Sequence, residues 1–248
     1  MINYEQVLQD TTNNPDIIGF ILTGSRGKGF QNEHSDYDAI VITKDESIEA
    51  IRAKYNEQKK DGMDLTVRSL SEFKASASWE SPDAWNRYDH AHMQLLVDKT
   101  DGEIEALIEE KGKIPDDKLN LFIEQSIDAY MNGVYRSVKC IRNHNPLGAH
   151  LEASNSILDL LTLIFALEGR HRPFLGYVQK ELDKYPLKKL PWSASDFVEK
   201  IKKVLESADL ETQQELLKGL EKISRDMGYG HIFDAWEGKD KWTMDFKA

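Results

Sequence analysis

The chain has 248 residues, and its 32 basic and 43 acidic side chains give a formal net charge of −11 at pH 7. Long nucleic acids and anionic membranes are bound mainly through basic residues, so this balance argues against both and favours a small cationic partner. The lone cysteine, Cys140, excludes an intramolecular disulfide and metal sites built from several cysteines. No apolar run predicts a transmembrane helix, and residues 1–10 lack the features of a signal peptide, so we expect a cytoplasmic protein.

The first 115 residues alternate between apolar runs typical of strands and polar segments typical of surface helices. A helix is expected over residues 3–12, and the run IIGFIL at 17–22 predicts a buried strand that ends at a glycine turn. After a loop over 24–35, the pattern predicts a surface helix at 47–60 and three more strands, at 37–43, 63–70 and 93–97. This half of the chain therefore predicts a small mixed sheet with helices.

The rest of the chain is predicted to be helical. The segment 111–117 combines Gly, Pro and charged residues, which indicates a linker or a helix entry. Beyond it, apolar periodicity predicts helices over 119–143, 148–168, 174–185, 195–208 and 210–227. We therefore expect an α/β (α+β) fold with two domains, a catalytic mixed-sheet domain over 1–115 and a helical bundle over 116–248.

The stretch around the first glycine turn carries the most specific signal for chemistry. The buried strand runs into Gly24-Ser25, ten residues follow, and Asp36-Tyr37-Asp38 opens the next strand. Residues i and i+2 of a strand point to the same face, so the two carboxylates are expected side by side. Such a pair repels itself unless a cation lies between, and Mg²⁺ prefers carboxylate oxygens together with substrate phosphates.

Groups that suit a phosphate chain flank this pair. Gly24 allows close approach of the backbone, Ser25 adds a hydroxyl, and Arg26 and Lys28 add positive charge. A third carboxylate, Asp64, lies where a buried strand would otherwise carry an apolar residue, and it can complete a two-metal clamp. Together these residues predict a metal-dependent site for a nucleoside triphosphate.

The order of Gly-Ser, ten residues, Asp-x-Asp and a lone Asp on a later strand resembles the DNA-polymerase-β-like nucleotidyltransferase superfamily. The sequences Ser-Arg-x-x-Gly at 25–29 and Ser-Asp-x-Asp at 35–38 are most similar to its antibiotic-modifying branch, which includes aminoglycoside and lincosamide adenylyltransferases with a helical C-terminal domain. The resemblance implies Mg²⁺ held by Asp36 and Asp38, with Asp64 as the third acid. The candidate nucleotide-binding residues are Gly24, Ser25, Arg26, Lys28 and Ser35.

The resemblance also implies a reaction. We expect transfer of AMP from ATP to a hydroxyl of a small acceptor, with release of pyrophosphate. An aminoglycoside is the first expectation for the acceptor, because the acidity of the chain suits a polycation, and antibiotic resistance would be the consequence. An oligomer is compatible with this sequence.

Polar residues recur every three or four positions along the apolar helix predicted at 148–168. They form a stripe that either lines a ligand cleft or faces solvent. In the first case Glu152 or Asp159 contacts cationic groups of the acceptor, and one of them deprotonates its hydroxyl, which makes Glu152 a candidate catalytic residue.

Three other functions stay open from the sequence. The chain could modify a protein or toxin partner, it could add nucleotides to a nucleic acid, against which its acidity argues, or it could be a catalytically silent nucleotide-binding module.

Overall fold

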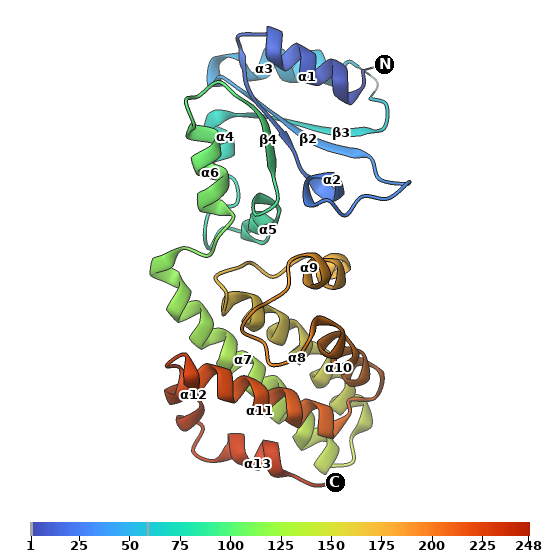
Figure 1. Ribbon diagram of the computed structural model, residues 1–248, viewed down its shortest axis with the longest axis vertical. Coiled ribbons are helices and arrows are strands. Elements are labelled where there is room, and N and C mark those ends of the chain that lie inside the picture. The colour runs from blue at the N-terminus through green and yellow to red at the C-terminus, as the bar shows by residue number, and fades with distance from the viewer. Residues whose placement is uncertain (1, 59) are drawn as a thin grey trace. The chain divides into compact units, whose positions relative to one another are not determined.

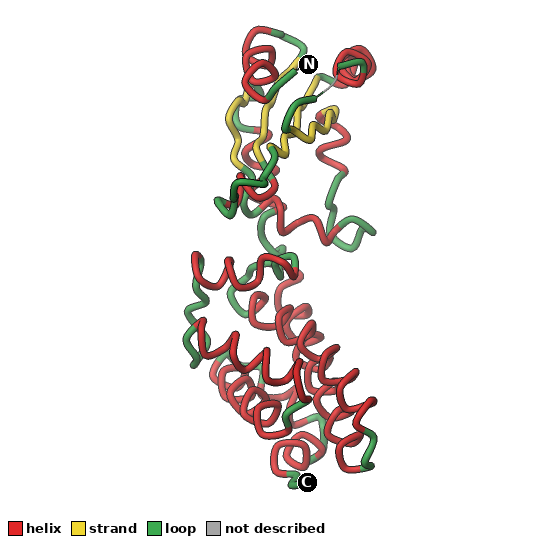
Figure 2. The backbone as a smooth tube through the Cα atoms, turned by 90° about the vertical axis from the view of Figure 1, so that its right-hand side faces the viewer, coloured by secondary structure: helices red, strands yellow, loops and turns green. Residues whose placement is uncertain are grey.

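The computed structural model describes residues 2–58 and 60–248, and the chain divides into two compact units, Met1–Pro115 and Asp116–Ala248. Figure 2 shows that the strands belong to the first unit and that the second is built from helices. The expected α/β fold class with a helical C-terminal region is confirmed. No helix in the described part of the chain is long and apolar enough to cross a membrane.

The sheet of the first unit has four strands in the order β3-β2-β1-β4. β1 runs antiparallel to both β2 and β4, whereas β2 and β3 are parallel, so the sheet is mixed as predicted. The apolar, β-branched runs noted in the sequence form its two central strands. The strands are β1 (Ile17–Leu22), β2 (Tyr37–Thr43), β3 (Met63–Ser69) and β4 (Gln94–Asp98).

Helices cover both faces of this sheet (Figure 1). On one face, α1 (Tyr4–Asn13) and α3 (Ile48–Asn56) bury a cluster that includes Phe20 and Val41. On the other face, Ile40 packs into a second cluster with residues of two further helices. These are α4 (Leu70–Ala75) and α6 (Glu103–Lys111), and α5 (Arg87–His90) lies on the same side.

The second unit is built around two long helices that pack along one another, α7 (Asp116–Arg142) and α8 (Pro146–Ala166). α8 begins two residues earlier than predicted, because the Asn145 side chain accepts a hydrogen bond from the Gly148 amide and Pro146 suits the first turn. The remaining helices are α9 (Val178–Lys184), α10 (Ala194–Ser207), α11 (Leu210–Asp226), α12 (Gly230–Asp234) and α13 (Lys239–Asp245).

Three local expectations need correction. The predicted loop over 24–35 begins with a short helix, α2 (Gly24–Lys28), which Gly29 ends in a left-handed conformation. The helix predicted over 47–60 ends at Asn56, and residue 59 lies outside the described residues. α4 was not predicted, although the reciprocal capping of Ser69 and Glu72 marks its start.

Two buried cations anchor the segment between α4 and β4. Lys111 is 3% exposed, and its ammonium donates to the carbonyls of Lys74 at 2.8 Å and Ser76 at 2.5 Å. Arg87 is 1% exposed and donates to three carbonyls, those of Ala77, Glu110 and Lys113. Because each cation bonds to carbonyls from separate parts of the chain, the two cations hold the path of residues 74–93.

Replacing Lys111 with Met is therefore expected to destabilise this segment. The substitution leaves two carbonyls without their donor, at a cost of about 1–3 kcal/mol for each buried group. Hydrogen exchange of peptides within 74–93 measures the loss. The matched control is Lys44→Met, which removes an exposed pair with Asp16 that contributes about 0–1 kcal/mol. Equal protection of the segment in the two variants would contradict this role for Lys111.

Candidate active site

The turn at Gly24 lies against the carboxylate of Asp38. Gly24 has a φ of +60°, and a Cβ built on it would lie 1.7 Å from the Asp38 Oδ2 atom. The Thr23 amide also donates to the Asp38 carbonyl at 2.9 Å. Only glycine allows this approach, so the glycine turn and the carboxylate predicted from the sequence are brought together as one structural unit.

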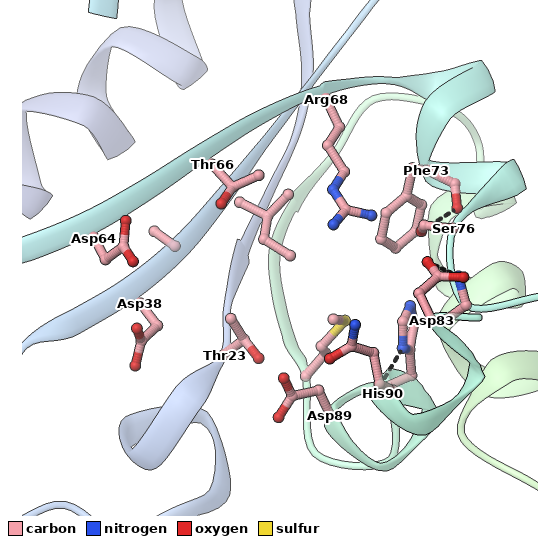
Figure 3. Close-up of a pocket in the computed structure, with 15 residues that line it drawn as sticks. Thr23, Asp38, Asp64, Thr66, Arg68, Phe73, Ser76, Asp83, Asp89 and His90 are labelled. Carbon is pink, nitrogen blue, oxygen red and sulfur yellow. Dashed lines mark hydrogen bonds between the residues drawn. The ribbon is translucent and has the colours of Figure 1, made fainter. Parts of the chain in front are cut away.

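The register of the parallel strands places a second carboxylate beside the first. Asp38 on β2 pairs with Asp64 on β3, so both side chains lie on the same face of the sheet, and Asp36 precedes Asp38 by two residues. Figure 3 shows Asp38 and Asp64 on their neighbouring strands. Burial raises the pKa of Asp38, and the negative charges of Asp36 and Asp64 raise it further.

Asp38 and Asp64 share a face of the sheet, and the charge of Asp36 acts on Asp38 from just before β2, but the three carboxylates do not form a closed metal cage. Across residues 2–58 and 60–248, no group of three or more His, Cys, Asp or Glu residues is close enough to hold a metal ion by itself. Mg²⁺ needs only one or two carboxylates when substrate phosphates supply further oxygens. The donor set, all oxygen, and the mutual repulsion felt by Asp38 therefore fit a divalent cation that arrives with a nucleotide.

Arg26 holds the loop that leads into the carboxylates. Its guanidinium donates to the carbonyls of Asp36 at 2.9 Å and Ser35 at 2.8 Å, and it lies 4.0 Å from the centre of the Tyr37 ring. The Ser35 hydroxyl accepts a hydrogen bond from the Asn32 amide at 2.9 Å. Both residues, predicted as nucleotide contacts, are thus engaged in shaping the loop.

Lys28 is placed differently from the sequence expectation. It is 1% exposed, its ammonium forms an ion pair with Asp89, and it donates to the Gly24 carbonyl at 3.2 Å. A buried and paired ammonium is not presented to phosphates at the surface, so the structure gives Lys28 the position of a support under the Gly24 turn. Its positive charge also opposes the rise in the pKa of Asp38.

Glu152, the candidate from the helical half, lies on α8 in the second unit. Its carboxylate pairs with Arg136 of α7 at 2.5 Å. Asp159 lies on the same helix, where burial raises the pKa of its carboxyl and Arg172 opposes that rise. The observed contacts of Glu152 are those of a pair between two packed helices.

Sequence reasoning missed the residues that extend the site beyond the carboxylates. Asp38 and Asp64 line a cavity together with Arg68, Asp89 and His90 (Figure 3). Arg68 follows Asp64 by four residues on the same strand, so the alternation of β3 could have revealed it. Asp89 and His90 lie on α5, in a segment without a periodic pattern, so no comparable signal was available for them.

The sequence model of a family described as a nucleotidyltransferase domain matches residues 5–132. A crystal structure of a nucleotidyltransferase-like protein from Exiguobacterium sibiricum 255-15 is similar to the chain with 13% identity and a TM-score of 0.43, and the match covers 97% of this chain and 76% of that one. No curated protein matches the chain.

A pair of glycine variants tests the contact between Gly24 and Asp38. Gly24 and Gly62 have nearly the same φ, +60° and +59°, but no atom lies within 4 Å of a Cβ at Gly62. Gly62→Ala is therefore expected to cost about 1–2 kcal/mol of left-handed strain alone. Gly24→Ala should cost a further 1–3 kcal/mol, roughly that of overpacking, and should weaken Mg²⁺ binding. Hydrogen exchange of β1 and β2 measures the costs, and equal values would count against the contact.

A second pair of variants tests the electrostatics of Asp38 through stability. Because its pKa is raised in the folded state, the ionised carboxylate costs folding free energy as the pH rises through that pKa. Asp38→Asn is therefore expected to raise the melting temperature at pH 7.5 and to raise it less at pH 4. Calorimetry at the two pH values measures the difference.

The control for Asp38 has the opposite sign. Hydrogen bonds from Ser71 lower the pKa of Asp45 to about 2, so its ionised form contributes stability above the unfolded pKa, which is lost as the pH falls toward 2. Asp45→Asn should lower the melting temperature at pH 7.5. A fall for both variants at that pH would refute the repulsion at Asp38.

Proposed function

The chain belongs to the nucleotidyltransferase family, within the DNA-polymerase-β-like superfamily, and from this premise we propose that it transfers AMP from ATP to a hydroxyl group of a small acceptor. The observation that carries the proposal is the contact of the Gly24 turn with Asp38, beside which Asp64 lies in register. It combines a place for phosphates with carboxylates for a divalent cation on one face of a sheet. We assign this reaction to residues 1–115 and regard residues 116–248 as the helical domain.

In this proposal the three carboxylates hold the metal. Asp36, Asp38 and Asp64 supply oxygen ligands to Mg²⁺, which, when bound, orients the triphosphate and neutralises its charge. The repulsion at Asp38 supports this role, because a cation relieves it.

The nucleotide phosphates would lie at the start of α2. The close packing of Gly24 against Asp38 holds this turn beside the carboxylates, and the Ser25 hydroxyl can donate to a phosphate oxygen. Arg26 and Ser35 would act by holding the loop that presents Asp36, and Lys28 by supporting the Gly24 turn from below. In this proposal Arg26 and Lys28 therefore position the site and do not bind phosphate.

The transfer step forms one bond and breaks one. The acceptor oxygen bonds to the α-phosphorus of ATP while the bond from that phosphorus to the bridging oxygen breaks, and pyrophosphate leaves. Asp64, exposed at the edge of the sheet, is the group we propose to accept the hydroxyl proton. Glu152 is left out of this step because its carboxylate is engaged by Arg136.

Asparagine at each carboxylate of the pair tests the function. Asp36→Asn and Asp38→Asn remove a metal ligand at nearly constant volume, so pyrophosphate release from ATP and Mg²⁺ should fall by about 10²–10³-fold or more. The assay uses a panel of small hydroxyl compounds, aminoglycosides included. The control is Glu49→Gln on α3, whose side chain is 85% exposed. Full activity in both asparagine variants would refute the assignment, and ATP binding without turnover of any acceptor would indicate a silent module.

A further inference from the structure

A cavity of about 170 Å³ opens beside the carboxylates within the first unit. Its lining runs from Asp38 and Asp64 along β3 to Arg68, and residues from 73–93 form the opposite wall (Figure 3). At roughly 30 Å³ for each water molecule, this volume holds about six waters or a compound of a few carbon atoms. The cavity therefore suits a small ligand or one end of a larger ligand.

The proposed function decides which substrate enters here, so the inference rests on it. In an in-line displacement, the attacking oxygen approaches phosphorus opposite the leaving oxygen. With pyrophosphate leaving at Gly24 and Ser25, the attacking hydroxyl comes from the side of Asp38 and Asp64 that lies away from this turn. The lining of the cavity includes Thr23 and these two carboxylates at one end and continues along β3 to Arg68, away from the turn, so the cavity offers a place for the acceptor.

A row of polar side chains on β3 leads from the reacting centre into the cavity. Asp64, Thr66 and Arg68 alternate along the strand and line the same cavity. Asp64 and Arg68 are four residues apart on the strand, which corresponds to about 13 Å between their Cα atoms. The long arginine side chain shortens the distance that a ligand has to bridge between the carboxylate and the guanidinium. A small acceptor can thus place its hydroxyl near Asp64 and another group near Arg68.

Beyond Asp38 and Asp64, which the proposed function assigns to the metal, the charged group of this cavity that is still available to a ligand is a cation. Asp83 already accepts hydrogen bonds from the Ala77 amide at 2.9 Å and the Ser81 hydroxyl at 2.6 Å, and Asp89 is paired with Lys28. The guanidinium of Arg68 forms no hydrogen bond or ion pair with any described residue, although its charge lowers the pKa of Asp83 from a longer distance. Guanidinium is a planar donor that matches the oxygens of a carboxylate or phosphate.

We infer that the acceptor carries an anionic group, a carboxylate or a phosphate, which Arg68 binds while the hydroxyl lies at Asp64. Arg68 then determines the specificity for the acceptor and takes no part in the bond-making step. This inference departs from the cationic acceptor that the net charge suggested.

His90, on the opposite wall of the cavity, is an uncharged polar group that a ligand can reach. It is 4% exposed, its Nδ1 donates to the Asn86 carbonyl at 3.2 Å, and its Nε2 has no partner among the described residues. Burial lowers the pKa of His90 to about 4, so the ring is neutral at pH 7 and Nε2 is a hydrogen-bond acceptor. This wall therefore adds no second positive charge and offers an acceptor to an N–H or O–H group of the ligand.

Four three-carbon compounds that differ only in charge test the inference. Glycerate and glycerol 3-phosphate carry the two candidate anions, glycerol is neutral, and 3-amino-1,2-propanediol is cationic. Their binding to the full chain is measured by ligand-observed NMR, with Mg²⁺ and α,β-methylene ATP present and again without them. At least one anionic compound is expected to bind about tenfold more tightly than glycerol, and the cationic compound is expected to bind more weakly than glycerol. Comparing glycerate with glycerol 3-phosphate shows whether the site prefers a carboxylate or a phosphate.

Variants of Arg68 connect this preference to the residue. Arg68→Gln should remove the anion preference, and Arg68→Lys should retain part of it. Lys44→Gln, which removes a cation at the far end of β2, should leave it unchanged. No anion preference, no binding of any compound at millimolar concentration, or a preference that survives in Arg68→Gln would overturn the inference. Failure of the nucleotide analogue to bind would instead count against the proposed function. The two failures can be distinguished because the titration without the analogue tests anion binding by itself.

Discussion

The absence of a side chain at Gly24 is the constraint on which this site depends. Any Cβ there would occupy the position of the Asp38 carboxylate, so the turn before α2 and the start of β2 can meet only if the turn residue is glycine. The hydrogen bond from the Thr23 amide to the Asp38 carbonyl locks the same two segments together. The parallel register of β2 and β3 then brings Asp64 alongside. One close contact thus sets the relative positions of the turn and of two carboxylates.

Buried cations hold the surroundings of this contact in place. Lys28 joins α2 to α5 through Asp89 and bonds to the Gly24 carbonyl, whereas Arg87 and Lys111 bond to backbone carbonyls on either side of α5. Each cation is at most 3% exposed, so each needs its partners to offset the loss of hydration. The chain therefore uses positive charge inside the first unit mainly to fix irregular backbone. This leaves the carboxylates of Asp38 and Asp64 free of close cationic partners and suited to a metal.

The parts of the fold that followed from the sequence are those with a strong local signal. The apolar runs predicted β1 and β2. The spacing of Gly24, Asp36 and Asp38 indicated that a glycine turn and two carboxylates lie at the ends of these strands, because strand periodicity alone places residues i and i+2 on one face. The burial of Lys28 could not be predicted from the sequence, because its partner, Asp89, is 61 residues away in the chain. The segment that carries Asp89 and His90 has short helical turns held by long-range bonds from Arg87 and Lys111, and such bonds leave no periodic trace in a sequence.

Net charge and local charge lead to different partners for this protein. A value of −11 describes the whole surface, and it bears on solubility and on repulsion of polyanions. A ligand inside a cavity instead meets the few groups that are not already engaged there. Near Asp64, the carboxylates of Asp83 and Asp89 are occupied by donors of the chain, whereas the guanidinium of Arg68 is not. Recognition is decided by groups that lose hydration on binding and gain a partner, so the arginine carries more weight for the acceptor than the excess of acidic residues elsewhere on the surface.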